Sequence, residues 1–109
     1  MSDWTRIPGL ADNTGSAGDR PDVAVLSRNS GANVVRLSFL AGQTMPDHCT
    51  GRPILVVGQS GEIDFTVDDV TSRLEPGVAI HVAPSVRHAL AASTDAVVTL
   101  VVLESPATP

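Results

Sequence analysis

The chain of 109 residues fits a single domain, and its 42% hydrophobic residues are enough to form a buried core. Seven basic and twelve acidic residues give a formal charge of −5, and every basic residue is an arginine. This balance excludes partners that need a basic surface, so we expect the chain to bind neither nucleic acid nor an anionic membrane.

The first 22 residues predict an arm outside the core. Residues 11–22 combine Gly, Ser, Asn, Asp and Pro with almost no apolar side chain, which is typical of a loosely held segment. We therefore divide the chain into a partly flexible arm at 1–22, a barrel domain at 23–104 and a fraying polar tail at 105–109. The single cysteine, Cys49, and the lack of any long apolar run lead us to expect a cytoplasmic protein.

From residue 23 onward, short apolar runs alternate with clusters of Gly, Pro, Asp and Ser, a pattern typical of strands joined by turns. Ile63, Phe65 and Val67 alternate with polar residues, as on a strand with one buried face. Asp68 and Asp69 then form a two-residue link suited to a hairpin. No stretch keeps apolar residues at helical spacing, so the predicted class is all-β, an antiparallel barrel or two-sheet fold. The eight predicted strands are 23–27, 33–40, 53–57, 62–67, 70–74, 78–83, 87–92 and 96–104.

Two stretches of the chain resemble the conserved motifs of the cupin superfamily. The first motif consists of Gly, five residues, His, one residue, His, three or four residues, Glu, six residues and Gly. Gly42, His48 and Gly61 match its first glycine, first histidine and last glycine, while Gly77 and His88 match the two ends of the second motif. The resemblance covers about residues 33–104. It implies a single-domain cupin-type double-stranded β-helix, which is a jelly-roll barrel.

Many cupins hold a metal inside the barrel, with ligands from both motifs. Here Thr50 stands at the second His position and Ile54 at the Glu position, so the resemblance leaves only His48 and His88 as candidate metal ligands. Two imidazoles without a carboxylate give a divalent cation too few protein ligands and leave its charge without compensation. We therefore expect no required cofactor, or a weakly held divalent Fe, Mn, Ni or Zn.

The leading hypothesis is a small bacterial-type cupin that binds a small molecule in the barrel. His48, Thr50 and His88 would orient this ligand, and Arg52 and Ile54 complete the predicted ligand-binding residues. The alternative is a metal-dependent oxygenase or isomerase that uses His48 and His88 as metal ligands. A third interpretation, a structural or interaction domain, rests on the incomplete site. No catalytic residue is assigned.

Other candidate residues have simpler interpretations. His81 should face away from the core if Ile80 and Val82 fill it. Arg87, like Arg52, flanks a motif and could hold an anion at the barrel rim. A homodimer is expected because an open jelly-roll edge and the apolar strand at 96–103 need cover, and because the resemblance implies pairing through the terminal strands.

Overall fold

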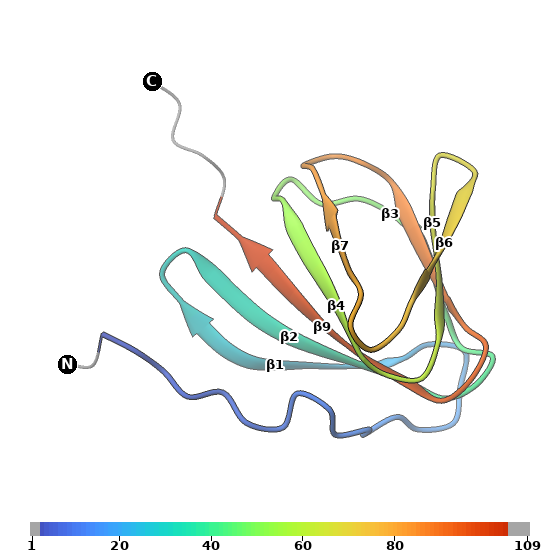
Figure 1. Ribbon diagram of the computed structural model, residues 1–109, viewed down its shortest axis with the longest axis horizontal. Coiled ribbons are helices and arrows are strands. Elements are labelled where there is room, and N and C mark those ends of the chain that lie inside the picture. Colours follow the sequence, from blue (N-terminus) through green and yellow to red (C-terminus); the bar gives the residue numbers. More distant parts are fainter. Residues whose placement is uncertain (1–2, 105–109) are drawn as a thin grey trace.

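The computed structural model describes residues 3–104 and folds them into two antiparallel β-sheets that face each other (Figure 1). One sheet has five strands in the order β1-β2-β9-β4-β7, and the other has four in the order β3-β8-β5-β6. The predicted all-β jelly-roll barrel is confirmed. The strands are β1 (Asp22–Asn29), β2 (Ala32–Phe39), β3 (Thr44–His48), β4 (Ile54–Ser60), β5 (Ile63–Val67), β6 (Val70–Leu74), β7 (Ala79–Val82), β8 (His88–Ala92) and β9 (Ala96–Leu103).

Within residues 3–104, no helix is long and apolar enough to cross a membrane. The predicted tail at 105–109 lies outside the described residues, as do residues 1–2 of the predicted arm.

The core lies between the two sheets, because alternate side chains on each strand point inward. On β5, Ile63 and Phe65 are buried, whereas Asp64 and Thr66 between and after them are partly exposed. The inward residues of both sheets form one apolar cluster, which fills the space between the layers. Its buried members are Val35, Leu37, Phe39, Ile54, Val56, Ile63, Phe65, Leu74, Val82, Leu90, Ala92, Ala96 and Val98.

The strand β3 was absent from the predicted elements. Its sequence, TMPDH, contains a proline and shows no alternation of apolar and polar residues. β3 forms an edge of the four-stranded sheet, where Pro46 is tolerated because an edge strand can leave an N–H position unpaired. Its register with β8 shifts between Met45 and His48. The strand missing from the prediction therefore carries one of the predicted site residues.

The two-residue link between β5 and β6 is confirmed. Val67 pairs with Val70 across the turn, and Asp68 and Asp69 have φ angles of 50° and 65°. Two consecutive residues with positive φ are typical of the type I′ hairpin turn, which matches the twist of the strands.

The apolar strand β9 is an inner strand of its sheet. It lies between β2 and β4, where Ala96, Val97 and Val98 are buried within the chain and residues 100–103 are partly exposed. The open edge of this sheet is β1, where Val23 is 56% exposed and Val25 is 46% exposed. The homodimer itself stays a prediction.

The segment before β1 runs alongside β1 and β2 (Figure 1). Arg36 Nη1 on β2 donates to Gly9 O at 2.8 Å, and Ser38 Oγ donates to Asp12 O at 3.2 Å. Gln43 Nε2 donates to two further carbonyl oxygens, those of residues 16 and 18. The residues expected to form an arm are therefore hydrogen-bonded to the barrel between 9 and 18.

Gly61, which matches the last glycine of the first cupin motif, is required by the turn between β4 and β5. Its φ is +67°, and a Cβ there would overlap Asp95 O and Ala96 Cα at the start of β9. We expect Gly61→Ala to lower the free energy of unfolding by about 1–3 kcal/mol, because backbone atoms must move apart.

The control for this prediction is Gly51→Ala, where a Cβ would meet no atom within 4 Å. Urea denaturation should place this control within about 0.5 kcal/mol of the parent. Equal stability of the Gly61 and Gly51 variants would contradict the account of this turn.

Candidate functional site

The structure brings His48 and His88 together. They lie opposite each other on the neighbouring strands β3 and β8, where the shift in register pairs their Cα atoms. Their ring centroids are 4.3 Å apart, and the ring planes are tilted by 59°. Two of the predicted site residues, separated by 40 positions in the sequence, are therefore direct neighbours.

His88 is the buried member of the pair and is only 3% exposed. Its ring stacks on Phe65 of β5, with centroids 5.5 Å apart and planes within 4° of parallel. Burial lowers the pKa of His88 below its ordinary value, because the charged form loses water, and the nearby His48 lowers the pKa further. The hydrogen bond to Val86 O acts in the opposite direction. The net effect favours a neutral ring at His88.

Both rings are held by their own backbone. His48 Nδ1 lies 2.9 Å from Pro46 O, and His88 Nδ1 lies 3.0 Å from Val86 O. Each contact spans two residues along the chain. The rings are therefore oriented by local bonds and not only by packing, with His48 half-buried beside the buried His88.

Thr50 and Arg52 lie in the loop between β3 and β4, beyond the end of the strand that carries His48. Thr50 Oγ1 donates to Arg52 O at 2.8 Å and accepts from Arg52 N at 3.1 Å. The Thr50 hydroxyl is thus bonded within its own loop, and the Arg52 side chain is exposed.

Ile54 begins β4 and is part of the core, with 2% exposure. Its cross-strand neighbours are Val82 of β7 and Val102 of β9. An apolar residue therefore occupies the position where the resemblance expects a ligating glutamate.

The donor set does not fit a resident metal ion. Within residues 3–104, no group of three or more His, Cys, Asp or Glu side chains is arranged to hold one. His48 and His88 offer two imidazoles, but the Thr50 hydroxyl is directed to Arg52 and Ile54 has no lone pair. Two nitrogen ligands fall short of the three protein ligands that a catalytic transition-metal site usually has.

His81 lies away from this pair, on β7 of the other sheet. Its side chain is exposed, whereas the adjacent Val82 is buried and Ile80 packs against the core. Cys49 is also exposed. His81 therefore belongs to the outer surface.

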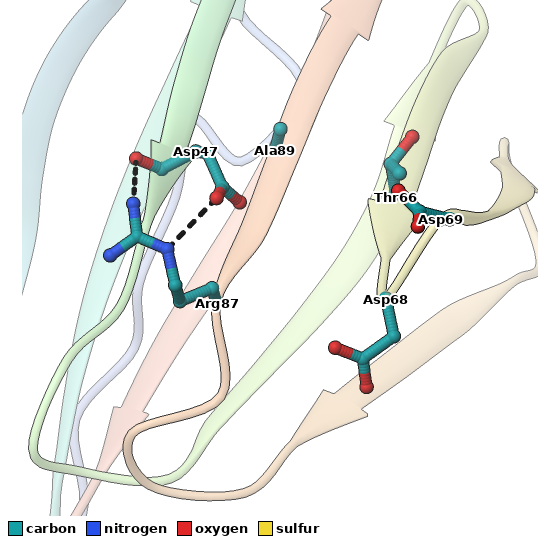
Figure 2. Close-up of a pocket in the computed structure, with 6 residues that line it drawn as sticks. All are labelled: Asp47, Thr66, Asp68, Asp69, Arg87 and Ala89. Atoms are coloured by element: carbon teal, nitrogen blue, oxygen red, sulfur yellow. Dashed lines mark hydrogen bonds and ion pairs between the residues drawn. The ribbon is translucent and has the colours of Figure 1, made fainter.

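Sequence reasoning missed an ion pair on the outer side of the same strands. Arg87 Nε donates to Asp47 Oδ2 at 2.8 Å, and Arg87 Nη2 donates to Asp47 O at 3.2 Å (Figure 2). The hydrogen bond and charge of Asp47 raise the pKa of Arg87 above its ordinary value. Because β3 and β8 are antiparallel, Asp47 and Arg87 are diagonal neighbours across the strand pair, and the long arginine side chain spans the offset between them. The sequence signal for this ion pair was the charged residue that directly precedes each of the two histidines.

A concavity of about 430 Å³ adjoins this ion pair (Figure 2). A smaller one of about 150 Å³ lies along β3, β5 and β8. Neither is lined by His48 or His88. The lining of the larger concavity is Asp47, Thr66, Asp68, Asp69, Arg87 and Ala89.

Comparisons with known proteins agree with this fold. A family model described as a cupin domain matches residues 35–104. A protein with a double-stranded β-helix domain from Klebsiella pneumoniae has a TM-score of 0.80 at 18% identity, and the match covers 96% of this chain and 95% of that one. A cupin superfamily protein from Desulfitobacterium hafniense has a TM-score of 0.76 at 17% identity, with 93% and 100% covered.

A third similar structure comes from Ralstonia eutropha and has been provisionally assigned as a mannose-6-phosphate isomerase. Its TM-score is 0.76 at 22% identity, with 93% of this chain and 100% of that chain covered. No curated protein matches the sequence. At these identities the structural likeness establishes the fold and not the activity.

The buried His88 predicts a pH-dependent stability. In the unfolded chain this imidazole titrates near the ordinary value of about 6.5, whereas in the folded chain it takes up a proton only at lower pH. The unfolded state therefore binds more protons below about pH 6.5, and the free energy of unfolding should fall as the pH drops through that value.

Urea denaturation between about pH 8 and pH 5 measures this slope. His88→Gln should reduce the slope, whereas His81→Gln, at an exposed position, should leave it unchanged. A His88→Gln variant with the slope of the parent would contradict the assignment of this titration to His88.

The buried Ile54 predicts the cost of restoring the family's carboxylate. Ile54→Glu should lower the free energy of unfolding by several kcal/mol, on the order of 3–5, because the carboxylate would enter the apolar cluster in which Ile54 is buried. Ala79→Glu, on the exposed side of β7, is the control and should change stability by no more than about 0.5 kcal/mol. Similar losses in both variants, measured by chemical denaturation, would contradict the inward placement of Ile54.

Proposed function

Because the chain belongs to the cupin family, we propose that it binds a small molecule at the His48–His88 pair and that it does so without a resident metal. In the cupin barrel, polar side chains from the two motifs meet on neighbouring strands. In this chain the polar groups at that point are two imidazoles.

The observation that carries the proposal is the contact between His48 and His88 beside the ring of Phe65. Small-molecule sites usually combine an apolar lining with a few oriented polar groups, and this pair supplies two such groups beside an apolar ring. His48 is half-buried, so the pair can be approached from solvent on its side.

Packing alone does not explain a histidine at position 88. A buried polar ring is costly unless it is hydrogen-bonded, and an apolar residue at position 88 would fill the space beside Phe65 without that cost. Two adjacent imidazoles, one of them buried against Phe65, therefore support a role in recognition.

The alternative, a metal-dependent oxygenase or isomerase, is supported less well. The likeness to the Ralstonia eutropha protein is compatible with an isomerase, but it concerns the fold. The ligands that such a metal would need beyond His48 and His88 are replaced by Thr50 and Ile54. We therefore place ligand binding ahead of metal chemistry.

A screen of small molecules by thermal shift, on protein treated with a chelator, tests the proposal. A ligand at about a hundred times its Kd should stabilise the folded state by about 2.7 kcal/mol, because it binds only that state. His48→Ala should abolish the shift, and His81→Ala should preserve it, since His81 lies on the outer face of the other sheet. A screen with no stabilising compound, or with hits that survive His48→Ala, would contradict the proposal.

A further inference from the structure

The bonds that hold the two histidine rings also decide which nitrogen of each ring carries a proton. In both rings Nδ1 contacts a backbone carbonyl oxygen, at 2.9 Å for His48 and 3.0 Å for His88. A carbonyl oxygen can only accept a hydrogen bond, so Nδ1 must be the donor in each contact. A neutral imidazole has one N–H, and Nε2 of each ring is therefore left with a lone pair.

Three side chains next to the pair, Phe65, Thr50 and Arg87, supply no donor to these two acceptors. Phe65, on which His88 stacks, is apolar. The Thr50 hydroxyl donates its proton to Arg52 O, two residues along its loop. The Arg87 guanidinium is turned to Asp47 on the outer side of the sheet (Figure 2). The pair thus offers a ligand two hydrogen-bond acceptors.

We infer that the ligand of this site donates hydrogen bonds to both imidazoles, as a neutral diol or a protonated amine does and as a carboxylate does not. The inference rests on the proposed function, since it concerns the same site. While both rings are neutral, the oxygens of a carboxylate would face two lone pairs, so no hydrogen bond would form. A donor group satisfies both nitrogens, and a positive charge on it is favourable beside them.

The first test examines the rings without any ligand. Long-range proton–nitrogen NMR at about pH 8, above the ordinary imidazole pKa, distinguishes the Nδ1–H form from the Nε2–H form. The chain has three histidines, so His48→Gln and His81→Gln assign all three sets of signals by their loss. We expect the Nδ1–H form for His48 and His88. The Nε2–H form in either ring would overturn the inference, whatever the protein binds.

The second test uses three probes built on one carbon ring: cyclohexane-1,2-diol, 1,2-diaminocyclohexane and cyclohexane-1,2-dicarboxylate. Each is titrated into the protein while the Nε2 signals of His48 and His88 are followed. We expect the diol and the diamine to bind at least about tenfold more tightly than the dicarboxylate. The His81 signals, from the outer face of the other sheet, should stay unchanged with all three.

The outcomes separate this inference from the proposed function. Binding of the dicarboxylate as tightly as the diol would overturn the inference and leave the proposed function standing. Failure of all three probes to move either Nε2 signal at high millimolar concentration would contradict the proposed function, and the inference would fail with it.

Discussion

The pairing of β3 with β8 is the constraint on which the candidate site depends. β3 is a short edge strand of five residues, and it reaches its partner only with a shift in register between Met45 and His48. That shift sets His48 opposite His88, and it also sets Asp47 beside Arg87 on the outer side. A pairing displaced by one residue would turn His48 to the other face of the sheet, because side chains alternate along a strand. One local irregularity therefore produces both the imidazole pair and the ion pair behind it.

The chemistry of the site follows from what surrounds this pair. A cupin barrel with two further ligands would hold a cation, whose charge the carboxylate would offset. In this chain the carboxylate position is Ile54, which is buried in the apolar cluster, and the loop hydroxyl of Thr50 is bonded to its own backbone. The same fold therefore presents His88 stacked on Phe65 with His48 beside it, which suits recognition by hydrogen bonds better than coordination. The burial that lowers the pKa of His88 favours a neutral ring at that position.

The fold was largely predictable from the sequence, whereas the site was predictable only in part. The alternation of Ile63, Phe65 and Val67 marks β5 because a half-buried strand repeats every two residues. β3 left no such mark, since an edge strand with Pro46 in a bulge buries little and needs no apolar period. The motif resemblance located His48 and His88, but the stacking on Phe65 joins residues 23 positions apart on different strands and depends on strand register. The roles of Thr50 and Ile54 could not be inferred from spacing either. Thr50 lies in the loop after β3, whereas Ile54 lies in the core at the start of β4.

The metal content of the untagged protein tests the central claim most directly. The parent chain and His48→Ala would be purified from medium supplemented with Fe, Mn, Ni and Zn, and measured by inductively coupled plasma mass spectrometry. The account predicts that both contain far less than a stoichiometric amount of any transition metal, with no difference between them, because two imidazoles are too few ligands to retain a cation through purification. A stoichiometric metal in the parent that is lost in His48→Ala would contradict the account and restore metal coordination as the function of the histidine pair.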